Sequence, residues 1–76
     1  MSTKSKLFWR CRRGVKELDV VLTRYLESGY DKATDADKQS FENLLTYQDP
    51  DILRFLLQQE TPEDENIARI IEKIRN

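Results

Sequence analysis

Apolar residues recur at three- and four-residue intervals along most of this chain, and that spacing sets its fold class. The clearest stripe is Ile67, Ile70, Ile71 and Ile74, which has the i, i+3, i+4, i+7 spacing of a helix with one buried face. Glycine and proline occur only twice each, so few of the residues that tight hairpins need are present. The pattern predicts an all-α fold, and the chain is long enough for a single domain, residues 1–76.

The first two helices are predicted from their ends. Arg12 and Arg13 are expected in the last turn of the first helix, where positive charge complements the helix dipole. Gly14 follows as a left-handed cap, and the second helix is expected to end at Gly29. The inner face of the second helix is predicted to carry the following residues: Val15, Leu18, Leu22, Tyr25 and Leu26.

Three further helices are predicted from capping residues. Thr34 is the expected N-cap of the third helix. Asp49 is expected to cap the fourth, with Pro50 at its first position, and Thr61 and Pro62 indicate a similar start for the fifth. The fourth helix is apolar around most of its circumference, so we expect it to be the central and most buried element. The predicted architecture is a small bundle of about five short helices.

The residue types on which most enzymes depend are either missing or explained by helix starts. The chain has no histidine, and Cys11 alone cannot build a thiolate metal cluster. Paired acids such as Asp35 and Asp37 fall at predicted helix starts, where capping and the dipole favour them. We therefore predict that the protein is not an enzyme, has no catalytic residue, and holds no metal or cofactor of its own.

Cysteine usage and the distribution of charge indicate the compartment of the protein and the kind of partner that it binds. A lone cysteine favours a reducing compartment, and no apolar run approaches the roughly 20 residues that span a membrane. We expect a cytoplasmic protein that is not inserted into a membrane. Residues 1–16 carry six of the 13 bases and no acid, whereas residues 17–76 hold all 14 acids. This asymmetry indicates an acidic partner surface, a nucleic acid, or simply a solvated basic helix end.

The most informative pattern is Arg-Gly-x-x-Glu, formed by Arg13, Gly14 and Glu17. If the second helix begins near Gly14, Arg13 and Glu17 project toward the same side, and the bare glycine lets another backbone approach. The predicted result is a flat patch with a guanidinium fork suited to binding a partner. The alternative is a capping glycine beside a surface ion pair, which is worth only about 0.3–0.5 kcal/mol.

The stretch from Cys11 to Asp19 closely resembles the signature of the succinate dehydrogenase flavinylation factors. These are small bacterial assembly factors related to mitochondrial succinate dehydrogenase assembly factor 2, and Arg-Gly-x-x-Glu early in the chain marks them. The resemblance continues in Tyr30-Asp31 with the acids after it, and in the Asp-Pro-Asp helix start at residues 49–56. It covers residues 7–60 in all.

The resemblance implies a factor that binds the flavoprotein subunit of succinate dehydrogenase, or of its fumarate reductase relatives. It would promote covalent attachment of FAD to a histidine of that subunit, so that the FAD belongs to the client. Gly14→Arg is expected to block docking while leaving the fold intact. The residues expected to bind the partner are Trp9, Arg12, Arg13, Gly14, Lys16, Glu17 and Asp19. For Trp9, packing over the first two helices is an equal alternative.

Rival functions follow from the basic segment 4–16. A helical nucleic-acid-binding module would use these bases on phosphates, and its binding would depend strongly on salt. The carboxylate of Glu17 would repel phosphate and most of the chain is acidic, so we expect no nucleic-acid partner. An antitoxin-like helical regulator is another alternative, and a purely structural helical bundle is a third.

Overall fold

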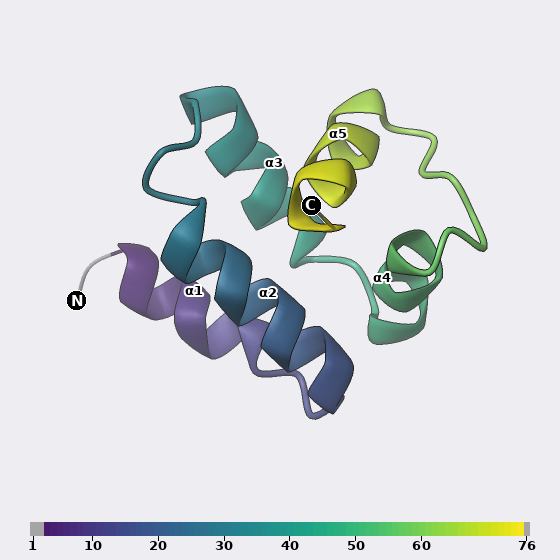
Figure 1. Ribbon diagram of the computed structural model, residues 1–76, viewed down its shortest axis with the longest axis horizontal. Coiled ribbons are helices and arrows are strands. Elements are labelled where there is room, and N and C mark those ends of the chain that lie inside the picture. Colours follow the sequence, from purple (N-terminus) through teal and green to yellow (C-terminus); the bar gives the residue numbers. More distant parts are fainter. Residues whose placement is uncertain (1–2, 76) are drawn as a thin grey trace.

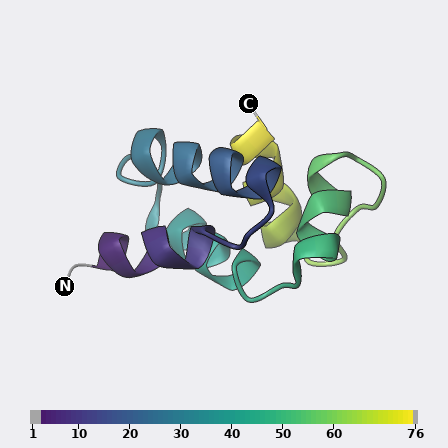
Figure 2. The same cartoon turned by 90° about the horizontal axis from the view of Figure 1, so that it is seen from below.

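The computed structural model describes residues 3–75, and over that range it contains five helices and no strand (Figure 1). Their bounds are α1 Thr3–Cys11, α2 Lys16–Ser28, α3 Asp35–Leu44, α4 Asp49–Leu56 and α5 Glu65–Arg75. α1 packs along α2, α3 packs against α5, and α4 contacts both α5 and α2 (Figure 2). The predicted all-α bundle of short helices is confirmed. No helix in this range is both long and apolar enough to cross a membrane.

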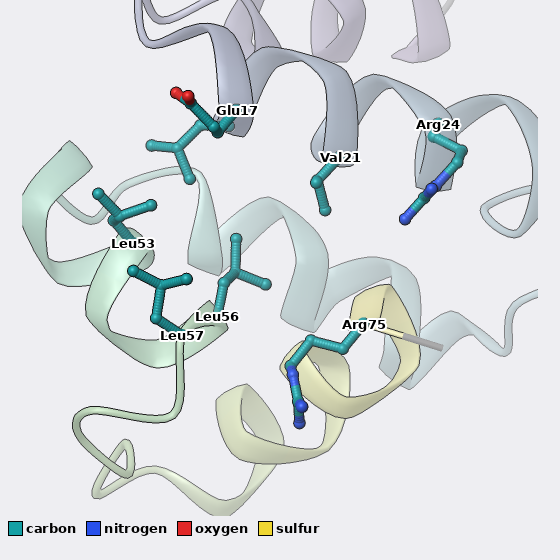
Figure 3. A pocket seen from close by; sticks show the side chains of 8 residues that line it. Glu17, Val21, Arg24, Leu53, Leu56, Leu57 and Arg75 are labelled. Carbon is teal, nitrogen blue, oxygen red and sulfur yellow. The ribbon is translucent and has the colours of Figure 1, made fainter.

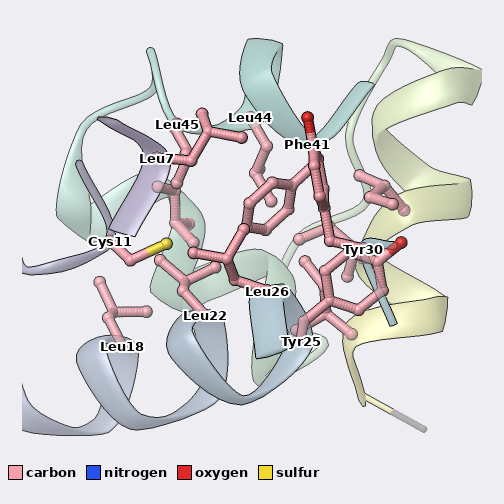
Figure 4. Close-up of a cluster of buried hydrophobic side chains, with 14 of the residues drawn as sticks. Leu7, Cys11, Leu18, Leu22, Tyr25, Leu26, Tyr30, Phe41, Leu44 and Leu45 are labelled. Carbon is pink, nitrogen blue, oxygen red and sulfur yellow. The ribbon is translucent and has the colours of Figure 1, made fainter. Parts of the chain in front are cut away.

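One hydrophobic core draws on all five helices (Figure 4). The rings of Tyr25 and Tyr30 pack on Phe41 at its centre, with centroid separations of 5.1 and 5.9 Å. The apolar stripes predicted for α2 and α5 are buried, except that Val15 is only half-buried. The largest fully buried side chains are Leu7, Cys11, Leu18, Leu22, Leu26, Phe41, Leu44, Ile52, Ile67 and Ile70.

Two helix ends lie where they were predicted. The hydroxyl of Thr34 accepts a hydrogen bond from the backbone N–H of Asp37 at 3.1 Å, which confirms Thr34 as the N-cap of α3. α2 ends at Ser28, and the N–H of Gly29 donates to the carbonyl of Tyr25. Gly29 has a φ of −118°, so this end does not use the left-handed cap conformation.

Three other predicted helix ends are wrong. α1 stops at Cys11, so Arg12 and Arg13 lie beyond it and Arg10 is the base in its last turn. Gln48, not Asp49, is the N-cap of α4, because the Asp49 carboxylate is bonded to Arg13 instead of to its own helix.

The start of α5 is the third. Thr61 and Pro62 lie in the preceding loop, and α5 begins only at Glu65. Asp64 closes its first turn, since its carboxylate accepts from the N–H of Asn66 at 2.8 Å and its carbonyl accepts from Ala68.

The prediction that α4 is the most buried helix is also wrong. Only Ile52 and Phe55 of this helix are buried, whereas Leu53 and Leu56 are half-buried. Leu57, which caps the helix, is 57% exposed. α4 lies at one side of the bundle (Figure 1), so it carries more apolar surface than the core takes up.

Cys11 is fully buried in the hydrophobic core, where it packs as a small apolar residue. Burial raises the pKa of its thiol to about 11, and the nearby guanidinium of Arg13 offsets only part of that rise. The thiolate, which is the reactive form, is therefore scarce at neutral pH.

An ion pair between an almost fully buried acid and a half-exposed lysine makes the stability of the fold dependent on pH. Lys73 donates a 2.5 Å hydrogen bond to the almost fully buried Asp37, and this bond holds the pKa of the Asp37 carboxyl below its ordinary value. Because the folded-state pKa is the lower one, the pair stabilises the fold above the unfolded-state pKa of about 3.9. That contribution is lost as the pH falls through the folded-state pKa.

Asp37→Asn should therefore reduce the stability at neutral pH and flatten its fall in acid. Urea unfolding at a series of pH values between about 5 and 2 would measure this slope. Asp35→Asn is the control, because it removes an acid from the same helical turn and leaves the Asp37–Lys73 pair intact. Equal slopes for wild type and Asp37→Asn would show that the Lys73 pair does not govern the acid response.

Candidate partner-binding surface

A short link between α1 and α2 carries the Arg-Gly-x-x-Glu pattern. Gly14 lies in this link with a φ of +88°, a conformation that L side chains rarely adopt. A Cβ built at Gly14 would meet no atom within 4 Å, and the residue is exposed. The backbone turn therefore requires glycine here, while the space around it stays open to another molecule.

Arg13 fastens this link to the connection between α3 and α4. Its Nε donates to the carboxylate of Asp49, while Nη1 donates to the carbonyl of Leu45 at 2.9 Å. Nη2 donates to the carbonyl of Tyr47 at 2.5 Å. All three nitrogens of the guanidinium are thus bonded within the chain, and Arg13 joins segments more than thirty residues apart.

Asp19 holds the same link from the side of α2. Its carboxylate accepts a hydrogen bond of 2.6 Å from the backbone N–H of Arg13. Its own N–H donates to the carbonyl of Val15, the N-cap of α2, in the first turn of the helix. Asp19 therefore ties the link to α2, as Arg13 ties it to α4.

The predicted patch shared by Arg13 and Glu17 is not formed. The ion-pair partner of Arg13 is Asp49, and Arg13 lines a shallow hollow with Trp9 and Arg12. Glu17 lines a different hollow, between α2 and α4. The two residues diverge because α2 begins only at Lys16, so that Arg13 lies in the link and not on the helix that carries Glu17.

The other predicted contact residues lie at the surface. Arg12, Lys16 and Glu17 are exposed, and no hydrogen bond or ion pair from residues 3–75 engages their side chains. Trp9 is 64% exposed and meets the ring of Phe8 edge-on at 5.8 Å. An indole so exposed adds little to the core and is available to a partner.

Sequence reasoning missed the groove that Glu17 borders. A hollow of about 240 Å³, here called the apolar groove, lies between α2 and α4 (Figure 3). Its signal in the sequence was the wide apolar circumference of α4, which exceeds what one buried face needs. The side chains that line it include Glu17, Val21 and Arg24 of α2, Leu53, Leu56 and Leu57 at α4, and Arg75 of α5.

The left-handed backbone of Gly14 gives a testable expectation. Gly14→Ala should lower the free energy of unfolding by about 1–2 kcal/mol, from backbone strain alone, because its Cβ meets open space. Gly14→Arg carries the same penalty, which the sequence-based expectation of an intact fold did not include. Urea unfolding would measure both. Gly14→Asn is the control, since asparagine tolerates this conformation better; equal stability of the alanine variant would contradict the assigned backbone.

Comparison with known proteins gives the family. A family described as flavinator of succinate dehydrogenase matches residues 5–76. The FAD assembly factor SdhE of Legionella pneumophila (strain Lens) is 42% identical over 73 residues, which are 96% of this chain and 91% of that protein. The FAD assembly factor SdhE of Methylococcus capsulatus is 43% identical over 75 residues, with coverages of 99% and 90%. The factor of the same name from Photorhabdus laumondii is 38% identical over 76 residues, with coverages of 100% and 86%. With its motif link exposed at the surface and this similarity along almost its whole length, the chain belongs to the family of flavinators of succinate dehydrogenase.

Proposed function

We propose that this protein binds the flavoprotein subunit of succinate dehydrogenase and promotes the covalent attachment of FAD to it. The observation that carries the proposal is the family match over residues 5–76, supported by relatives that are FAD assembly factors. The exposed Gly14 and Glu17 of the motif give such a factor a surface on which to receive a client.

The contact residues in this proposal divide into two roles. Trp9, Arg12, Gly14, Lys16 and Glu17 are exposed and touch the client directly. The side chains of Arg13 and Asp19 are already bonded within the chain, so they act by holding the motif link in place. This revises the expected direct contact of the Arg13 guanidinium with the partner, because a partner group would have to displace Asp49 or a backbone carbonyl.

The mechanism is one of positioning. In this proposal the histidine that receives the flavin belongs to the client, and so does the FAD, which agrees with a chain that has no histidine of its own. The factor holds the client's domains so that flavin and histidine meet in a reactive arrangement. Favourable alignment of two reacting groups alone supplies large rate gains. In this proposal the factor is a chaperone and not an enzyme.

The client and the compartment complete the proposal. The flavoprotein of fumarate reductase is a second client, if its FAD requires the same attachment to histidine. The factor works in the cytoplasm, where the buried Cys11 stays a thiol. The nucleic-acid alternative gains no support, since Lys4 and Arg13 of the basic segment are paired with Asp31 and Asp49.

Direct binding tests the role of Glu17. We expect Glu17→Ala to bind the purified flavoprotein subunit about tenfold more weakly than wild type, as truncation of a central contact residue does. Glu27→Ala, which removes another exposed acid from α2, is the matched control and should bind normally. Calorimetry would give both dissociation constants. Equal affinity of the two variants would remove Glu17 from the contact surface.

A further inference from the structure

The apolar groove is unusual for the surface of so small a protein. Leu53 and Leu56 of α4 form one wall, Val21 of α2 forms the other, and Leu57 stands at the edge (Figure 3). Leu57 is 57% exposed, although burying a leucine is favourable by about 1.5–3 kcal/mol. An apolar strip with a charged rim is typical of surfaces that receive another protein.

The size of the groove limits what it can take. Its volume of about 240 Å³ lies below the roughly 300–1,000 Å³ of pockets that enclose small molecules. The groove is open along one side, between two helices that both belong to this chain. It therefore suits one or two apolar side chains of a protein segment better than a free cofactor such as FAD.

Charge at the two ends of the groove is asymmetric. Arg24 and Arg75 come from facing elements at one end, while Glu17 lies toward the other (Figure 3). No acid within residues 3–75 forms an ion pair with Arg24 or Arg75. The positive charge that these two arginines give to this end of the apolar groove suits a carboxylate carried by an apolar segment.

The local backbone holds this arrangement in place. Just beyond the end of α4, Gln58 adopts the left-handed conformation, with a φ of 62°. The N–H of Gln59 donates to the carbonyl of Arg54 at 2.9 Å. This is the Schellman ending of a helix, with glutamine where glycine is usual. With the Gln58 amide oriented so that its oxygen faces Arg75, that oxygen accepts from both Nη1 and Nη2, at 2.5 and 2.7 Å. These hydrogen bonds hold the guanidinium of Arg75 at the end of the groove, and no ion pair within residues 3–75 neutralises its charge.

We propose that the apolar groove docks an apolar segment of the flavoprotein client that bears a carboxylate at the end nearest Arg24 and Arg75. The inference rests on the proposed function and extends the contact surface from Glu17 along α2 to α4 and α5. Glu17 connects the motif link with the apolar groove, because it belongs both to the motif and to the lining of the groove. The client segment would lie between α2 and α4, with its apolar side chains on Leu53, Leu56 and Leu57.

A matched pair of variants tests the apolar part of this proposal. Leu57→Lys places a charge at the edge of the groove, whereas Val20→Lys makes a similar change on α2 away from it. The two side chains have nearly equal exposure, 57% and 55%, so neither variant removes core packing. We expect Leu57→Lys to bind the purified flavoprotein subunit about tenfold more weakly and Val20→Lys to bind like wild type. Thermal unfolding of both variants checks that each is folded, and Leu57→Ala is the milder substitute if Leu57→Lys is not.

A second pair tests the charge. Arg24→Glu should weaken client binding, and its effect should shrink at high salt, because an exposed charge contact is screened. Lys32→Glu gives the same change of net charge on an exposed residue outside the groove and should have little effect. Equal binding by Arg24→Glu and Lys32→Glu would overturn the assignment of a carboxylate to this end.

The outcomes separate this inference from the proposed function. If wild type itself fails to bind the flavoprotein, the proposed function fails, and the groove proposal fails with it. If wild type and Val20→Lys bind and Leu57→Lys binds equally well, only the groove proposal is overturned. Sedimentation of the factor alone tests whether a second copy of this chain occupies the groove instead. If Leu57→Lys abolishes self-association and leaves client affinity unchanged, the groove proposal is overturned and the groove is assigned to a second copy.

Discussion

Arg13→Ala is expected to lower the free energy of unfolding by about 2–3 kcal/mol, a large effect for a residue outside the core. The substitution leaves the Asp49 carboxylate and the carbonyls of Leu45 and Tyr47 without their donors. Breaking a buried pair is worth about 3–5 kcal/mol. The Arg13 and Asp49 side chains remain 17% and 30% exposed, so water replaces part of the loss. Urea unfolding would measure the change.

The neighbouring residue supplies the control. Arg12 is exposed and unbonded within residues 3–75, so Arg12→Ala should change stability by less than about 0.5 kcal/mol. A double-mutant cycle with Asp49→Ala should show a coupling of about 0.5–3 kcal/mol. Arg13→Lys should recover little, since an ammonium cannot reproduce the three-way fork. Equal effects of Arg12→Ala and Arg13→Ala would mean that Arg13 does not fasten the link.

Phe41→Ala should have the largest effect on stability, about 3–5 kcal/mol. Phe41 is fully buried, and two tyrosine rings pack on it (Figure 4). A domain of this length has a total stability of only about 4–11 kcal/mol, from roughly 0.05–0.15 kcal/mol per residue. We therefore expect a variant that is partly unfolded at 37 °C, as measured by circular dichroism during heating.

Two further substitutions serve as controls for the effect of Phe41→Ala. Phe41→Leu keeps most of the apolar volume and should lose less than about 1.5 kcal/mol. Val20→Ala changes an exposed apolar side chain on α2 and should be nearly neutral. A loss below 1 kcal/mol for Phe41→Ala would contradict its place at the centre of the core.

Prediction from sequence succeeded where one local pattern decides the structure. The isoleucine stripe of α5 places four side chains on one face, and any bundle must bury that face. Thr34 caps α3 because its hydroxyl has no stronger partner than the first turn that follows it. Periodicity and local capping therefore gave the helices and most of the core.

Prediction failed where a distant residue competes. Asp49 is of a residue type favoured at N-caps and lies at the start of a helix. Its carboxylate nevertheless binds Arg13, which is 36 positions away in the chain. The spacing of residues along the chain does not reveal that pair. The same pair also holds Arg13 away from the surface patch that the spacing of Arg13 and Glu17 predicted. The apolar circumference of α4 predicts a buried helix, whereas part of that circumference lines a groove. Apolar pattern alone does not distinguish a core from an interface.

Covalent flavin on the client flavoprotein tests the central claim most directly. It is read as fluorescence of the denatured subunit after electrophoresis, in cells with this protein, without it, and with Glu17→Ala in its place. The account predicts a fluorescent subunit only with the wild-type factor, and a strongly reduced signal with Glu17→Ala. Equal fluorescence in all three would contradict the claim that this chain promotes the attachment of FAD.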